Sequence, residues 1–191
     1  MSKRIVVVGG GVGGTMLANQ LVSKLYPEVS RGEVSVTLLS DSPDHYYKPA
    51  FMYVAFNLFF QEELKRPERS LLRPEIHFHV DKVTRFEFNS QELLTQQGKR
   101  YGYDYLVIAT GCLPAPERIE GLKEAGDHFY QDAPARQLAS RLSKIDKGRI
   151  FVSVTFPKTP NVPHQCGIAP IETTLMPVSY THLRAHETGR N

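Results

Sequence analysis

The sequence predicts an α/β fold in which a parallel sheet carries a small antiparallel insert, and three observations favour it. A short apolar run at residues 5–8 leads directly into glycines and then into a helical pattern. Further runs at residues 34–39 and 103–111 are rich in apolar side chains, and the second is expected to be a buried strand. Residues 82–88 and 93–96 flank a polar turn, which is typical of an antiparallel meander.

The first strand and helix enclose a glycine-rich turn, in "RIVVVGGGVGGTMLANQL". Gly9, Gly11 and Gly14 have the G-x-G-x-x-G spacing of a Rossmann-like dinucleotide-binding turn. The first glycine permits the tight bend, the second lets backbone amides approach a pyrophosphate, and the third permits close packing of helix on strand. The apolar face of the helix is expected to consist of Val12, Met16, Leu21 and Leu25. We therefore predict a pyrophosphate site at the positive N-terminus of this helix.

The second strand ends in Ser40 and Asp41, where a dinucleotide site carries an acidic residue about 20 residues beyond the glycines. Ser40 takes the place of that acid, and Asp41 follows it. Either side chain can bond a ribose hydroxyl, and Asp41 is equally well an ordinary turn residue. Because FAD and NAD share the adenosine diphosphate half, this strand leaves the nucleotide open.

Residues 45–60, "HYYKPAFMYVAFNLFF", are dense in aromatic side chains. We expect core packing for most of them. The alternative is that Lys48, Pro49 and the following alanine line a planar cofactor or an apolar electron acceptor. The charged, proline-punctuated segment 61–75 is expected to be a surface loop or a short helix.

His77 and His79 alternate with apolar residues and so lie on one face of a short strand. Two such histidines could ligate a metal ion. Without a third ligand at a recognisable spacing, the pattern favours solvent-facing side chains and no metal site.

The segment "NVPHQCGIAPIE" places Cys166 among prolines, just before a predicted helix start at Pro170 and Glu172. A helix N-terminus favours the thiolate, which is the reactive form of a cysteine. Prolines at 160 and 163 restrict the backbone around the sulfur. Cys166 is therefore a candidate catalytic residue, and the alternative is a buried structural thiol.

Composition excludes several classes of protein. The 191 residues carry a formal charge of +3 with scattered Lys and Arg, which gives no case for nucleic-acid binding. The longest apolar stretch, 51–60, is too short to span a bilayer. No N-terminal targeting pattern precedes the first strand, so we expect a cytoplasmic protein. Two cysteines are weak support for a structural disulfide.

Three regions are expected along the chain. Residues 1–115 form the N-terminal part of the nucleotide-binding domain, and 116–177 form a linker and the start of a second, incomplete nucleotide-binding-like domain. The latter region has a helical pattern at 138–145 and a strand pattern at 148–156. Residues 178–191 include "VSYTHLRAHET", which resembles the translation of a sequencing adapter, so we expect a non-native tail on the front part of a longer protein.

Four motifs in order support a family resemblance: "VVVGGGVGG", "VTLLSDSPDHYYKPAF", "YDYLVIATG" and "HQCGIAPIE". Together they resemble the FAD-dependent pyridine-nucleotide-disulfide oxidoreductases. Within that superfamily they are most similar to sulfide:quinone oxidoreductases and flavocytochrome c sulfide dehydrogenase. The resemblance implies a flavoprotein with two dinucleotide-binding domains, of which this chain holds the N-terminal part of the first and the start of the second.

The resemblance also implies which residues surround FAD. Gly9, Gly11 and Gly14 would hold the pyrophosphate, and Ser40 the ribose. The other implied contacts are Val83 at the adenine edge through its backbone, Ala109, Thr110 and Gly111 where the chain returns to the cofactor, and Lys48 and Pro49 beside the flavin. Cys166 matches a redox-active cysteine beside the isoalloxazine.

The implied activity is oxidation of sulfide to polysulfide or sulfur, with electrons passing through FAD to a quinone. Gln131 stands about where three-cysteine members of the group carry a cysteine, so a two-cysteine variant is expected, with its second redox cysteine outside this chain. The chain alone is expected to be inactive. Peripheral membrane association is expected through a later C-terminal part, and a homo-oligomer stays open. The alternatives are a type II NADH:quinone oxidoreductase and a non-catalytic nucleotide-binding protein.

Overall fold

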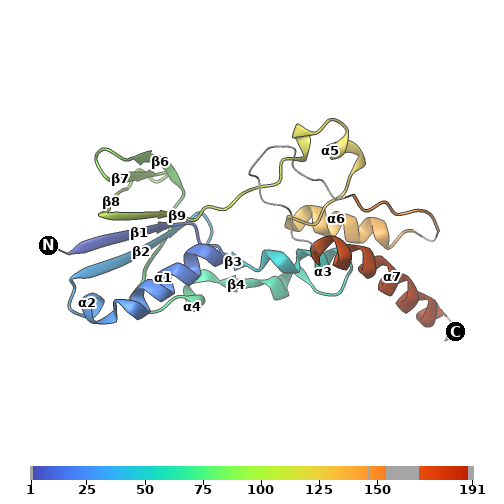
Figure 1. Ribbon diagram of the computed structural model, residues 1–191, viewed down its shortest axis with the longest axis horizontal. Coiled ribbons are helices and arrows are strands. Elements are labelled where there is room, and N and C mark those ends of the chain that lie inside the picture. Colours follow the sequence, from blue (N-terminus) through green and yellow to red (C-terminus); the bar gives the residue numbers. More distant parts are fainter. Residues whose placement is uncertain (1, 146, 154–167, 189–191) are drawn as a thin grey trace. The chain divides into compact units, whose positions relative to one another are not determined.

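The computed structural model describes residues 2–145, 147–153 and 168–188 (Figure 1). The chain divides into two compact units, of which the first comprises Met1–Tyr47 and Glu62–Ala115 and the second Lys48–Gln61 and Pro116–Asn191. The segment Lys48–Gln61, which lies in sequence between the two parts of the first unit, therefore belongs to the second unit.

The first unit is built on a four-stranded parallel sheet, which confirms the predicted fold class. Its strands are β1 (Lys3–Val8), β2 (Val34–Ser40), β5 (His77–Val80) and β9 (Tyr105–Ile108). Their order is β5-β2-β1-β9, and every neighbouring pair runs parallel. In register, Val7 of β1 lies between Leu38 and Val107. The C-terminal ends of the strands consequently meet at one edge, where open α/β sheets bind ligands.

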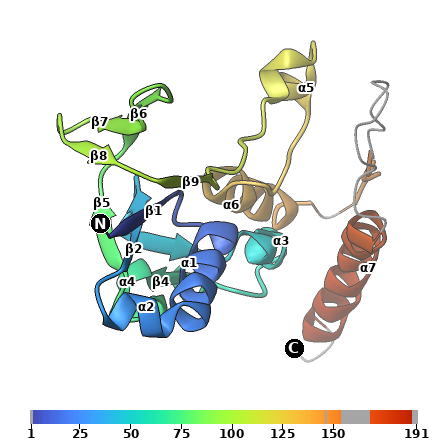
Figure 2. The ribbon, with the colours of Figure 1, turned by 60° about the vertical axis from the view of Figure 1, so that its left-hand side comes forward.

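Side chains of β1 alternate between two apolar clusters, one on each face of the sheet. Ile5 and Val7 pack with Ala18 and Val22 of the first helix. On the other face, buried side chains of the sheet and the meander form a cluster of Val6, Val8, Leu39, Leu93 and Tyr103. Figures 1 and 2 show helix α1 and the meander on opposite faces of the sheet.

Helix α1 (Val12–Lys24), followed by α2 (Tyr26–Ser30), faces the sheet with a different stripe from the predicted one. Its buried residues are Gly14, Thr15, Ala18 and Val22. Val12 is 45% and Met16 55% exposed, so these two predictions are wrong, whereas Leu21 and Leu25 pack partly buried against the cluster. Small residues face the sheet because the glycine turn holds the first turns of α1 close to β1.

The antiparallel insert has three strands, β6 (Val83–Glu87), β7 (Glu92–Thr95) and β8 (Arg100–Gly102). The first two confirm the predicted meander. The third was not predicted, because a three-residue strand is too short to show alternation. Gln91 (φ 53°) and Gly98 (φ 78°) adopt the left-handed backbone that the two tight turns require.

A second antiparallel pair precedes a short helix. Strand β3 (Asp44–Tyr46) pairs with β4 (Lys65–Pro67), and α4 (Glu68–Leu71) follows at once, after a 3-10 turn at Gln61–Leu64. The short helix agrees with one of the two expectations for segment 61–75. The expected surface placement is wrong for Glu68, whose side chain is 0% exposed.

The second unit is largely helical. It contains 3-10 turns at Lys48–Ala50 and Pro116–Arg118 and the helices α3 (Phe51–Ala55), α5 (Leu122–Ala125), α6 (Asp132–Leu142) and α7 (Ile168–Thr188). Helix α3 packs against α6. Core packing is confirmed for Phe51 and Phe56, but Phe60 is 78% exposed.

The patterns predicted beyond residue 137 are partly wrong. Leu138 and Leu142 face inward on α6, but the helix ends before Ile145, which is exposed. Residues 149–153 form no strand, and Phe151 is 86% exposed. Because this segment meets no partner strand among the described residues, its backbone groups lack the ladder that a strand needs.

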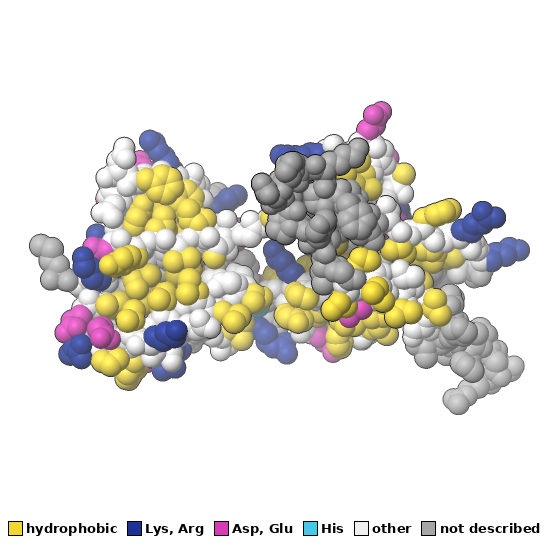
Figure 3. Space-filling model, viewed as in Figure 1, with side chains coloured by type: hydrophobic (Ala, Val, Ile, Leu, Met, Phe, Trp, Pro, Cys, Tyr) yellow, Lys and Arg dark blue, Asp and Glu magenta, His cyan; other side chains and the backbone are white. Residues whose placement is uncertain are grey.

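Strand β9 is the edge of the parallel sheet, which corrects the expectation of a fully buried strand. Tyr103 before it is buried, but Tyr105 and Ile108 are exposed because no strand pairs with this edge in the described part of the chain. In Figure 3, apolar side chains gather on the visible face of the unit that carries this sheet. Within the described ranges, no helix is both long and apolar enough for a bilayer crossing.

Asp104 locks β9 to β1 before the strand begins. Its carboxylate accepts the backbone N–H of Arg4 at 2.8 Å, and its own N–H donates to the Arg4 carbonyl at 2.9 Å. The Arg4 backbone bond is the main cause that lowers the pKa of Asp104 below its usual value; the Arg4 side chain and Lys3 lower it further, against an opposing effect of partial burial.

We predict that Asp104→Asn lowers the urea midpoint of unfolding at neutral pH, because the variant keeps an acceptor oxygen and loses the charge. A pKa that is lower in the folded state contributes stability above the unfolded carboxyl pKa of about 4, and this contribution disappears as pH falls through the folded value. The difference between the two proteins should therefore shrink in acid. Equal urea midpoints of the two proteins at pH 7 would contradict a stabilising role of the Asp104 charge.

Candidate functional site: the glycine loop and the C-terminal edge of the sheet

The loop between β1 and α1 is held against the end of β9. The Gly9 N–H donates to the Leu39 carbonyl at 2.8 Å, and the Ala109 N–H donates to the Val8 carbonyl at 2.8 Å. Gly9 has φ +115°, and a Cβ there would collide with the Ala109 carbonyl. A Cβ at Gly14 would collide with the Gly9 carbonyl and press on Val7. Larger residues at either position would push α1 off the sheet.

The N-terminus of α1 is open. Gly11 is its N-cap, with extended backbone, and no side chain caps it. The first turn carries no acidic residue. A Cβ at Gly11 or Gly13 would meet no atom within 4 Å, so the amides are approachable from this side. Unpaired N–H groups and the helix dipole make this an anion site, and its open cradle fits the diphosphate of a dinucleotide.

The ends of β2 and β5 flank the loop. The Ser40 side chain is buried, and its hydroxyl accepts the Ser42 N–H at 3.2 Å. Asp41 is exposed. The two candidate ribose ligands therefore differ in access, with Asp41 the free one and Ser40 engaged in the turn. Which of them binds ribose stays a prediction.

Beyond β5, Asp81 donates its N–H to the Ser40 carbonyl at 2.8 Å and is itself buried. One of its carboxylate oxygens accepts the Gln97 N–H at 3.3 Å, and the other has no hydrogen-bond partner among the described residues. Burial, and secondarily the Asp81 charge, raises the pKa of Tyr101. Val83, predicted to meet the adenine edge, opens β6 two residues later and is half-buried.

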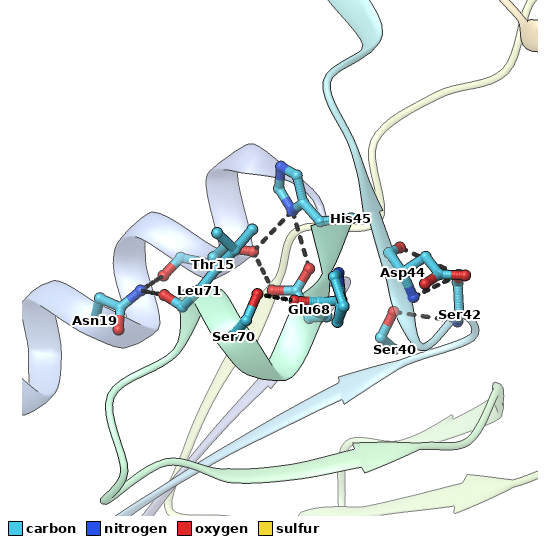
Figure 4. A network of polar contacts seen from close by, with 10 residues as sticks. Thr15, Asn19, Ser40, Ser42, Asp44, His45, Glu68, Ser70 and Leu71 are labelled. Carbon is cyan, nitrogen blue, oxygen red and sulfur yellow. Dashed lines mark hydrogen bonds and ion pairs between the residues drawn. The ribbon is translucent and has the colours of Figure 1, made fainter. Parts of the chain in front are cut away.

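A buried polar network lies under the loop, and sequence reasoning missed it. The Thr15 hydroxyl donates to Glu68 Oε1 at 2.6 Å, and His45 Nδ1 lies 2.9 Å from Glu68 Oε2 (Figure 4). Thr15 comes from α1, His45 from β3 and Glu68 from α4. Asn19 ties α1 to the same region, because its amide donates to the Leu71 carbonyl at 2.9 Å.

The signal that could have found Glu68 is weak. It stands in a charged, proline-rich segment that is typical of an exposed loop, and only the pairing of β3 with β4 turns it inward. Thr15 on α1 and His45 on β3, its partners in the network, belong to no recognisable sequence motif.

The other predicted residues are distributed as follows. Thr110, Gly111 and Cys112 follow β9 and are exposed. Lys48 and Pro49 belong to the second unit and are exposed, and their predicted position beside a flavin stays a prediction. Cys166 lies outside the described residues.

His77 and His79 are exposed on β5, as expected. Across the described ranges, no group of three or more His, Cys, Asp or Glu side chains could hold a metal ion.

The family model for pyridine nucleotide-disulphide oxidoreductases matches residues 3–152. The chain belongs to this family. The match covers the glycine loop, the parallel sheet and the meander, and it confirms the resemblance found in the sequence. The family is one of flavin-dependent oxidoreductases, which accords with the dinucleotide cradle described above.

Individual relatives point to quinone-linked enzymes. The mitochondrial sulfide:quinone oxidoreductase of Dictyostelium discoideum is 33% identical over 121 residues, which are 63% of this chain and 26% of that protein. A type II NADH:quinone oxidoreductase of Staphylococcus epidermidis is 27% identical over 141 residues, 73% of this chain and 34% of that protein. The chain thus spans about a quarter to a third of the length of these relatives.

Among solved structures, the sulfide:quinone oxidoreductase of the hyperthermophilic bacterium Aquifex aeolicus superimposes with a TM-score of 0.64 and 29% identity. The superposition covers 75% of this chain and 32% of that one.

We predict that Gly11→Ala weakens FAD binding by about tenfold or more. A methyl group at Gly11 has open space around it, and we expect it to obstruct the approach of the diphosphate to the amides. One lost hydrogen bond to a charged group costs about 1.5–3 kcal/mol. Ser23→Ala is the matched control, because Ser23 is exposed on the same helix outside the glycine loop and alanine favours the helix. Fluorescence titration of FAD measures both. Equal losses in the two variants would contradict the proposed approach path.

Proposed function

We propose that this chain binds FAD at the glycine loop, as part of a flavoprotein that oxidises sulfide and reduces a quinone. The observation that carries the FAD proposal is the uncapped α1 N-terminus beside Gly9 and Gly14, where approach to the amides is unobstructed. Support for sulfide comes from the 33% identity to a protein named sulfide:quinone oxidoreductase and from the position of Cys166 in the sequence.

In this proposal the first unit binds the adenosine diphosphate half of FAD. Backbone amides at Gly11 to Gly13 hold the diphosphate, and Ser40 or Asp41 bonds the ribose. The backbone of Val83 meets the adenine edge, and residues 109–111 complete the binding surface. Lys48 and Pro49 belong beside the flavin ring.

Cys166 is the proposed redox-active cysteine, and its thiolate, once released, would be the nucleophile toward the flavin. It precedes α7, which begins at Ile168, and a helix N-terminus favours the thiolate. Hydrosulfide attacks a disulfide between Cys166 and a second cysteine expected outside this chain. One S–S bond forms and one breaks, which leaves a persulfide on one sulfur and a thiolate on the other. Bound FAD supplies a two-electron acceptor that delivers the electrons to quinone.

Quinones partition into bilayers, so the proposal includes peripheral association of the whole protein with the cytoplasmic face of a membrane. The segment that would provide this association is expected in a later C-terminal part of the whole protein.

A second candidate function is NADH:quinone oxidoreduction, in which Cys166 has no role. The observation that favours it is the type II relative, whose match extends over more of this chain, at lower identity. The two functions differ in electron donor, so each donor is supplied separately in the test.

We predict that Cys166→Ser in the whole protein abolishes bleaching of the flavin absorbance by hydrosulfide under anaerobic conditions. Serine preserves the volume but is not a sulfur nucleophile. Cys112→Ser is the matched control, since Cys112 is exposed and the chain has two cysteines in all. It should bleach like the wild type.

Bleaching by NADH but not by hydrosulfide in the wild type would replace the sulfide proposal with the NADH alternative. Normal flavin binding with no bleaching by either donor would favour a nucleotide-binding protein without catalytic activity.

A further inference from the structure

We propose that His45 is an additional cationic determinant for the diphosphate, and that Glu68 is the positioning residue that holds it beside the glycine loop. The inference rests on the proposed dinucleotide binding and adds two residues that the glycine motif does not contain. It predicts that binding of the nucleotide is coupled to protonation of the imidazole.

The geometry fixes His45 tightly. Both oxygens of the Glu68 carboxylate are engaged, Oε1 by the Thr15 hydroxyl at 2.6 Å and Oε2 by His45 Nδ1 at 2.9 Å. The Thr15 hydroxyl also lies 3.5 Å from His45 Nδ1. Glu68 is fully buried, and the His45 side chain is 11% exposed. An ionised carboxylate requires a hydrogen on Nδ1, which leaves Nε2 as the nitrogen that gains or loses a proton.

The same carboxylate borders the predicted anion site. A Cβ built on Gly10, the middle residue of the first G-x-G, would lie 3.5 Å from Glu68 Cδ and 2.6 Å from the Ser40 hydroxyl. Thr15, which Glu68 holds, is the fourth residue of α1. Glu68 therefore borders the loop and contacts the first turns of α1, and His45 is bound to its carboxylate.

The charge of the pair determines the direction in which nucleotide affinity changes with pH. With neutral His45 the pair carries one negative charge in a buried position, and this charge repels an approaching diphosphate. Protonated His45 cancels it. Nucleotide affinity should consequently be highest where the imidazole is protonated and should fall as pH rises and the proton is lost. By linkage, bound nucleotide favours the protonated imidazole by the same factor.

Other charged groups around the pair are engaged elsewhere or far more exposed. Asp44 pairs with Lys65 at 2.8 Å, and the Arg69 guanidinium donates to the Pro74 and Ile76 carbonyls. Arg66 lies opposite His45 in the β3–β4 pair but is exposed and donates to the Lys65 carbonyl. The remaining carboxylates at this edge of the sheet are the exposed Asp41 and the buried Asp81.

The test is a titration of the 191-residue chain with FAD, and separately with ADP, from about pH 5.5 to about pH 8.5. We expect Kd to rise by about tenfold across this range for both ligands, because both carry the diphosphate. Adenosine, which lacks it, should bind with a flat pH profile.

Three variants separate a charge effect from loss of structure. His45→Gln should bind at every pH with the weak affinity of the wild type at high pH. Glu68→Gln keeps the size and an acceptor for Thr15 and removes the buried charge, so it should bind at high pH more tightly than the wild type. His77→Gln replaces an exposed histidine of the same unit and should keep the wild-type profile. Circular dichroism at each pH confirms the folded state.

The pair has only a structural role if both site variants bind FAD more weakly at every pH and keep the wild-type pH dependence. That result would overturn this inference but not the proposal that the chain binds FAD. The same slope in His45→Gln as in the wild type would also overturn it. Wild-type chain that binds neither FAD nor ADP at any pH would overturn both this inference and the proposed function.

Discussion

The close approach of α1 to the end of β1 is the constraint on which the site depends. Gly9 and Gly14 permit it, because a Cβ at either position would collide with backbone. The approach brings the unpaired amides of the helix to the edge where the strands end, beside the return of the chain at Ala109. Any anion bound there meets hydrogen-bond donors and the positive end of the helix dipole together.

The close packing of α1 on the sheet buries polar groups, which then need hydrogen-bond partners. Thr15 is buried on the sheet side of α1, and its hydroxyl needs a partner. Glu68 supplies one, and His45 Nδ1 lies 2.9 Å from the other oxygen of this buried carboxylate. The structure thus places a carboxylate beside a loop built for an anion, an arrangement that is compatible with tight binding only if the carboxylate is compensated. This is why a short, irregular segment such as β3–β4–α4 matters to the site as much as the glycine motif does.

Sequence alone predicted the elements whose signal is local. Apolar-rich runs and the glycine spacing predicted β1, α1, β2 and β9, and the polar turn after Phe88 indicated the meander. It failed where long-range contacts decide. The inward face of α1 consists mainly of small residues, because the helix packs close to the sheet. A prediction from hydrophobicity therefore selected Val12 and Met16, which are exposed. Glu68 is buried by the pairing of two three-residue strands about 20 residues apart in sequence, which no periodicity reveals.

Family membership and the geometry of the first unit converge on one central claim, that the α1 N-terminus receives the diphosphate of a dinucleotide. Amide chemical shifts of the isotopically labelled chain, recorded during titration with ADP, test it most directly. The account predicts that the largest shifts occur at the amides of Gly11, Val12 and Gly13. Shifts concentrated elsewhere, or none at these three amides at saturating ADP, would contradict it.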